Sequence, residues 1–110
     1  MSRDIRESDW KILKQLHPIA LERFCQRVFQ EVDGITSEAS ETFHQRYLAL
    51  YKIVERRDKE MESVFGSLRR SMALLQIAAL RSRGLLEDEE FVRFSEEVQG
   101  DVAVFLDGRA

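Results

Sequence analysis

Residues 55–71 read ERRDKEMESVFGSLRRS, a polar stretch between two apolar helical patterns, LALYKIV (48–54) and MALLQIAAL (72–80). The fold depends on whether the chain turns within this stretch or continues through it as one helix. A turn would allow a compact helical monomer. A continuous helix would be too long for the rest of a 110-residue chain to cover.

Apolar residues keep a regular spacing through this stretch. Starting at Tyr47, steps of alternately four and three residues reach apolar side chains at every position except Asp58. This heptad pattern is typical of a coiled coil and predicts a single long central helix over about 42–83. A break near Lys59 or Gly66 remains the alternative. The predicted dimer seam consists of Tyr47, Tyr51, Val54, Asp58, Met61, Phe65, Leu68, Met72, Leu75 and Ala79.

The rest of the chain also indicates helices. With one Pro and five Gly, it contains few helix breakers, so the predicted class is all-α. Pro18 interrupts the first apolar pattern and predicts a kinked helix pair with a corner at His17. Gly34 is expected to end the second of these helices, which carries one apolar stripe along its length. The stripe consists of Leu21, Phe24, Cys25, Val28 and Val32.

The remaining boundaries follow from capping residues. Ser40 or Thr42 would start the long helix, and Gly84 would end it in a left-handed conformation. Two short C-terminal helices should follow, the last one capped by Ser95. We expect one domain over residues 1–110, with residues 1–7 disordered and residues 107–110 frayed.

A single helix over 42–83 would predict a homodimer. At ~1.5 Å per residue it would be roughly 60 Å long, far beyond the ~13 Å radius of gyration of a compact chain of this size. Its apolar seam would remain in water unless a second copy covered it. Parallel and antiparallel pairing both remain open. Asp58 would either pair with neighbouring cations and set the register or reach solvent.

Charge is distributed unevenly along the sequence. Residues 42–83 carry nine Lys or Arg and four Asp or Glu, whereas residues 84–110 carry two and eight. The basic middle allows an alternative function, nucleic-acid association, because phosphate contacts dominate such binding. The net charge of −3 and the intervening acids weigh against it. The possible basic face consists of Arg56, Arg57, Lys59, Arg69, Arg70, Arg81 and Arg83.

Few residues are arranged for chemistry. Glu41 and His44 form one E-x-x-H pair, a weak metal candidate, because carboxylate–histidine sites in helix bundles need a second pair and further glutamates. Cys25 is the only cysteine, has no evident partner, and is expected to be a buried thiol in a reducing, cytoplasmic compartment. We find no nucleophile–base pattern or phosphate loop, and we expect neither a cofactor nor an enzyme.

One segment resembles a known family locally. Residues 80–94, LRSRGLLEDEEFVRF, resemble the short C-terminal oligomerisation segments of the SHOCT type, although the Lys-rich end of that pattern is missing. The resemblance implies an association role for Gly84, Leu85, Glu90 and Phe91.

The predicted function is therefore interaction. We expect a cytoplasmic helical protein that associates with itself and acts through protein–protein contacts, as an adaptor, regulator or structural partner. The sequence does not identify the partner. We expect no membrane association, because the sequence has no apolar run of about 18 residues.

Overall fold

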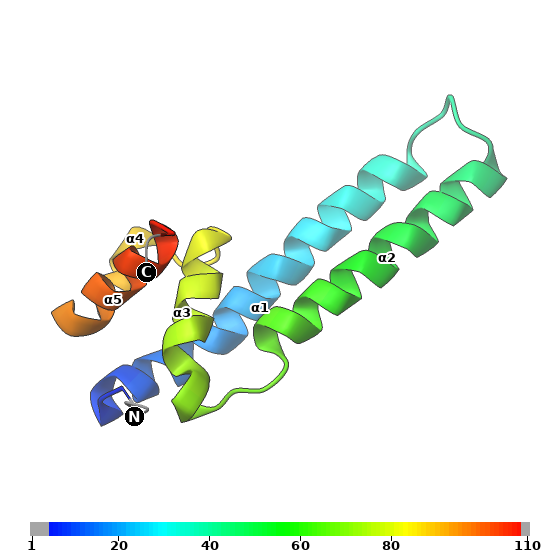
Figure 1. The fold of residues 1–110 in the computed structure, drawn as a ribbon. Helices are drawn as coiled ribbons and strands as arrows, with labels where there is room; N and C mark the ends of the chain where they lie inside the picture. The colour runs from blue at the N-terminus through cyan, green and yellow to red at the C-terminus, as the bar shows by residue number, and fades with distance from the viewer. Residues whose placement is uncertain (1–4, 109–110) are drawn as a thin grey trace.

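The computed structural model describes residues 5–108, and in this range the chain forms helices and no strand. The predicted all-α class is confirmed. Two long helices form an antiparallel hairpin, and the shorter helices pack beside one end of it (Figure 1). The elements are α1 (Glu7–Thr36), α2 (Phe43–Phe65), the 3-10 turn η1 (Arg70–Met72), α3 (Ala73–Ser82), α4 (Asp88–Phe91) and α5 (Glu96–Leu106).

The predicted corner at His17 is wrong, because α1 continues through Pro18. A proline inside a helix costs ~3 kcal/mol, since it removes one hydrogen bond and crowds the preceding turn. Pro18 is exposed, so water can satisfy the carbonyl that loses its donor. The opposite face of α1 buries Leu13, Leu16, Ala20 and Phe24. Burial of these side chains on both sides of the proline outweighs its cost.

The predicted single helix over 42–83 is also wrong, and the alternative break near Gly66 is confirmed. The helix α2 ends at Phe65, and the chain reaches α3 through residues 66–69 and the turn η1. A Cβ atom at position 66 would collide with the carbonyl oxygen of Glu62, so glycine permits this helix end. The turn buries Ile77 and Leu80 completely, at ~1.5–3 kcal/mol per side chain. Each backbone hydrogen bond lost at the break costs less, ~0.5–1.5 kcal/mol net.

Three predicted caps are confirmed. Thr42 caps α2, and its hydroxyl accepts a hydrogen bond from the backbone N–H of Gln45 at 3.0 Å. Gly84 has a φ of 67°, and the N–H groups of Gly84 and Leu85 donate to carbonyls in the last turn of α3, forming a Schellman motif. Ser95 caps α5. Gly34, in contrast, lies inside the last turn of α1, which ends at Thr36.

The ends of the chain are described in part. Of residues 1–7, which were predicted to be disordered, residues 1–4 lie outside the described residues and Glu7 begins α1. At the other end α5 stops at Leu106, and residues 109–110 of the predicted frayed tail lie outside the described range. Among residues 5–108, no helix combines the length and apolar character needed to cross a bilayer.

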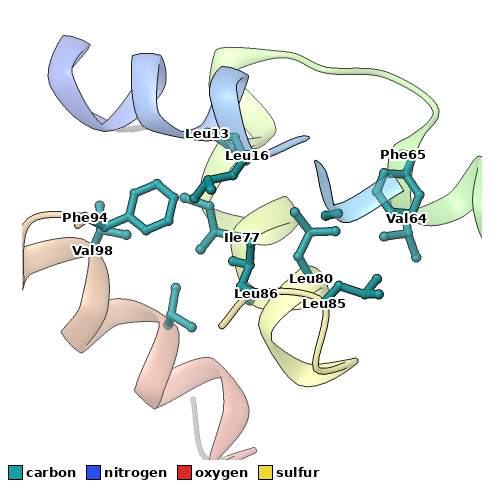
Figure 2. Close-up of a cluster of buried hydrophobic side chains, with 14 of the residues drawn as sticks. Leu13, Leu16, Val64, Phe65, Ile77, Leu80, Leu85, Leu86, Phe94 and Val98 are labelled. Carbon is teal, nitrogen blue, oxygen red and sulfur yellow. The ribbon is translucent and has the colours of Figure 1, made fainter. Parts of the chain in front are cut away.

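The hydrophobic core lies at one end of the hairpin. There the N-terminal part of α1 and the C-terminal end of α2 meet α3, the α3–α4 connection and α5 (Figure 2). Leu13 and Leu16 of α1 lie against Ile77 of α3, and Phe94 and Val98 close the cluster from the C-terminal segment (Figure 2). We call this end of the molecule the base.

The other end of the hairpin extends away from the base (Figure 1). We call residues 25–58 the arm. The principal extents of the molecule are 53 × 28 × 24 Å and its radius of gyration is 17.0 Å, compared with ~13 Å for a compact chain of this length. Within the arm, all of which the structure describes, Ile53 is the one buried apolar side chain. The arm is therefore held by little of its own core.

Candidate functional site

The candidate site is one long side of the arm. On this side of the hairpin, a hollow lined by Leu21 of α1 and Asp58 of α2 lies where the arm meets the base. Residues spaced by four, seven or eight and eleven positions lie on one face of a helix, so the two rows can be followed outward from that hollow. Together they form what we call the apolar side: Cys25, Phe29 and Val32 from α1, and Val54, Tyr51 and Tyr47 from α2.

The aromatic residues of the apolar side are largely uncovered. The exposed fractions are 73% for Phe29, 63% for Tyr47 and 61% for Tyr51. At ~200 Å² per aromatic side chain, these three expose roughly 400 Å². That value alone falls within the size of the largest apolar patch of a typical monomer, which is often functional.

The opposite side of the hairpin carries a network of paired charges where the arm meets the base. The guanidinium of Arg57 donates from Nε and Nη2 to the two carboxylate oxygens of Glu31, at 2.8 and 2.9 Å, and from Nη1 to Glu60 at 2.8 Å. Arg83, the residue that follows α3, donates to the other oxygen of Glu60 at 3.1 Å. These charges link α1, α2 and α3 on one side of the hairpin.

The pKa values of this network follow from its hydrogen bonds. The Arg57 hydrogen bonds lower the pKa of Glu31, and the two carboxylates raise the pKa of Arg57. Burial alone would raise the pKa of Glu60, but hydrogen bonds from Arg83 and Arg57 outweigh burial and leave that pKa lowered. All three groups are therefore charged at neutral pH, and their charges are used within the molecule.

The residues of the predicted dimer seam divide into separate groups. Tyr47, Tyr51, Val54 and Asp58 are exposed along α2, whereas Phe65 is buried against the rings of Phe24 and His17. Three seam residues that follow the turn line a second hollow together with the end of α2: Met72 of η1, and Leu75 and Ala79 of α3. The two remaining seam residues, Met61 and Leu68, are half-buried at the edge of the core.

The predicted basic face does not lie on one helix, because its residues belong to α2, the connection, η1 and α3. Four of its arginines make ion pairs with carboxylates. Arg70 contacts Glu7 at 2.7 Å, and Arg81 contacts Asp88 at 2.8 Å. Arg57 and Arg83 belong to the network described above, while Arg56, Lys59 and Arg69 are exposed.

The weak metal candidate lies at the start of α2. Glu41 and His44 are both exposed and flank the capping residue Thr42. In the part of the chain that the structure describes, no three His, Cys, Asp or Glu side chains are grouped to hold a metal ion.

The segment that resembles an oligomerisation motif makes contacts within the chain. Leu85 is buried, and Glu90 receives two hydrogen bonds from Arg23 at 2.6 and 2.8 Å. Phe91 is half-buried, with the Arg81 guanidinium 4.5 Å from its ring centre. These residues connect the C-terminal helices to α1 and α3.

Two features, one on the apolar side and one at the base, were missed from the sequence. Phe29 follows Cys25 by one helical turn but lies outside the apolar stripe that faces α2. A search for the buried face of the helix therefore did not select it. Asp9 is buried and accepts hydrogen bonds from the backbone N–H and hydroxyl of Ser95, each at 2.7 Å. That contact joins residues 86 positions apart, which local patterns do not reveal.

We compared the chain with known protein families, curated proteins and solved structures. No family model, curated protein or solved structure matches the chain.

Proposed function

We propose that this protein acts through protein–protein contacts, and that the apolar side of the arm is its contact surface. The observation that supports this proposal is the exposure of three aromatic rings, Phe29, Tyr47 and Tyr51, on one side of a slender hairpin. Tyrosine and phenylalanine are enriched in protein interfaces, where their large rings contribute much of the binding energy.

The arrangement of the arm favours this use over a purely structural one. Residues facing the α1–α2 interface include Ile53, which is buried, but the neighbouring row of Tyr47, Tyr51 and Val54 points away from that interface. A hairpin held together by these two helices would need no aromatic residues on its outside. The row therefore has the composition of a binding surface, and the base supplies the stability that holds it.

The proposal includes self-association, and adaptor, regulatory and structural roles are all compatible with it. We also propose a cytoplasmic site of action. Cys25 is half-buried at the lower end of the apolar side, and oxidation of its thiol would place polar atoms in the contact surface. A reducing compartment preserves that surface.

Crosslinking in the native cell tests the proposal. The tagged protein would be crosslinked to its neighbours, purified and analysed by mass spectrometry, in the wild type and in a Tyr47→Ser/Tyr51→Ser variant. We expect the variant to lose the specific partners that the wild type captures. An untagged copy of the same protein counts as one such partner. The matched control, Val92→Ser/Val104→Ser, changes two exposed apolar residues away from the arm and should keep them. An unchanged set of partners in the Tyr47→Ser/Tyr51→Ser variant would contradict the proposal.

A further inference from the structure

We infer that the partner of the apolar side is a second copy of the same chain, and that the two arms pack face to face and antiparallel. The two hairpins then form a four-helix bundle between molecules, centred near Tyr51. This inference rests on the proposed function and names its partner. It differs from pairing through one continuous helix, because only the arm takes part.

The size of the apolar side fits a symmetric dimer. Its three aromatic rings expose roughly 400 Å². Apolar atoms make up about 60% of a typical interface, so a surface with this apolar content extends over roughly 700 Å² per copy. Stable dimers bury about 800 Å² per partner. Phe43, which is 83% exposed at the start of α2, supplies further apolar area at the outer end of the arm.

The two sides of the arm differ in a way that limits assembly to a pair. The side that carries Glu31, Arg57 and Glu60 is charged, and these three groups are paired within the chain, so it offers no apolar surface to a partner. Only the opposite side is apolar. A surface that binds its own copy through a two-fold axis is closed after two molecules. Two different binding surfaces on one molecule would instead propagate into a filament.

The charge pattern along α2 selects the antiparallel orientation. His44 lies seven residues before Tyr51 and Asp58 lies seven residues after it, each ~10.5 Å from the centre along the helix. In an antiparallel pair, Asp58 of one copy meets His44 of the other at both ends of the interface. In a parallel pair, equal positions lie at the same level along the arms, so Asp58 would lie level with Asp58 of the second copy and ~21 Å along the axis from its His44.

This arrangement also gives Asp58 a role. It is the one charged residue in the row of Tyr47, Tyr51 and Val54, and it is exposed beside the hollow that contains Leu21 and Met61. Its carboxylate marks the place where the apolar row ends and the base begins. Facing the imidazole of the second copy, it would restrict the pair to one register.

Sedimentation of the purified protein tests whether the partner is a second copy. We expect the wild type at micromolar concentration to have twice the chain mass of 12.9 kDa. The Tyr47→Ser/Tyr51→Ser variant should remain helical by circular dichroism, with a dissociation constant raised at least 30-fold, since a buried interface tyrosine commonly contributes ~2 kcal/mol. The Val92→Ser/Val104→Ser control should sediment as the wild type does.

Disulfide crosslinking tests the orientation. In a Cys25→Ser background, mild oxidation would be applied to His44→Cys, to Asp58→Cys and to the double variant. Positions 44 and 58 are ~21 Å apart along one helix, so they cannot be bridged within a chain. We expect covalent dimers from the double variant alone. Dimers from each single variant would indicate parallel arms and overturn the inference, as would the absence of crosslinking in all three.

Charge reversal gives an independent readout of the same contact. His44→Glu should weaken the dimer because it places two carboxylates together at each end, and adding Asp58→Lys should restore the wild-type dissociation constant. If the second substitution restores nothing, the proposed pairing of these positions is wrong.

The two proposals fail in different ways. If the purified wild type is monomeric at every concentration tested, the second-copy inference is wrong. The proposed function nevertheless stands if the Tyr47→Ser/Tyr51→Ser variant loses other proteins in the cell. If that variant changes neither the mass nor the cellular partners, both are wrong.

Discussion

The base and the arm are two parts of the same helical hairpin, and both carry apolar residues at helical spacing. At the base, Leu13, Leu16 and Phe24 of α1 are buried in the core, where the Phe24 ring packs against Phe65 of α2. On the arm, Phe29 and Tyr51 remain largely in water, because no further element of the described chain reaches them. The difference teaches that spacing identifies the residues that share a helix face, whereas the elements that return to the hairpin decide which face is covered.

The largest expected effect separates the two regions by burial. Leu80→Ala removes a completely buried side chain at the base and should lower the free energy of unfolding by about 2–5 kcal/mol. Leu48→Ala, at an exposed position of the arm, should change it by no more than about 0.5 kcal/mol. Urea denaturation measures both. Equal losses would show that the arm is packed as tightly as the base.

The next effect concerns a buried carboxylate at the base. Asp9→Ala leaves the N–H and hydroxyl of Ser95 without their acceptor and should cost about 1–3 kcal/mol. The matched control is Asp101→Ala, because Asp101 is exposed on α5. Thermal or urea unfolding measures the free energy of unfolding of both variants. If Asp9→Ala leaves that free energy unchanged, water replaces the carboxylate as the acceptor.

Acid should affect the ion pairs of the base more than those of the arm. Hydrogen bonds from Arg23 lower the pKa of Glu90 below its ordinary value of 4.5. A carboxylate with a lowered pKa stabilises the fold above the pKa of the unfolded chain, and this stability is lost as the pH falls through the folded-state pKa. At neutral pH, Glu90→Gln should cost about 1–2 kcal/mol.

The arm provides the control for this prediction. The side chain of Glu31 is 39% exposed, compared with 15% for Glu90, so solvent screens its pair with Arg57 more strongly. Glu31→Gln should therefore cost less than Glu90→Gln, at most about 1 kcal/mol. Urea unfolding between pH 3 and pH 7, where glutamates titrate, compares the two. The comparison is reversed if Glu31→Gln removes more of the wild type's acid-dependent loss of stability than Glu90→Gln does.

The smallest effect tests the turn that separates α2 from α3. Gly66→Ala brings a Cβ atom against the Glu62 carbonyl and should destabilise the protein by about 1 kcal/mol. Gly100→Ala is the control, because nothing lies within 4 Å of a Cβ atom there inside α5. That substitution should stabilise the helix by about 0.5–1 kcal/mol. Stabilisation by both would show that a continuous helix across position 66 is tolerated.

Much of the local structure was predictable from the sequence. Thr42 and Ser95 were predicted as helix caps, and Gly84 as the residue that ends α3, because capping depends on groups within four residues of each other. The candidate site was predictable in part. Tyr47, Tyr51 and Val54 were assigned to one apolar row, but Phe29 and the covering of Phe65 depend on the second helix of the hairpin.

The sequence by itself determined that the chain is helical, and where α2 begins, α3 ends and α5 begins, since these outcomes follow from local terms of about 1 kcal/mol per residue. Tertiary structure decided the rest. It carried α1 through Pro18 and ended α2 at Gly66. Burial of Leu16, Ile77 and Leu80 in one core contributes several kcal/mol, which exceeds the local preferences at those two positions. The same packing drew the short helices to the base and left the apolar side of the arm uncovered.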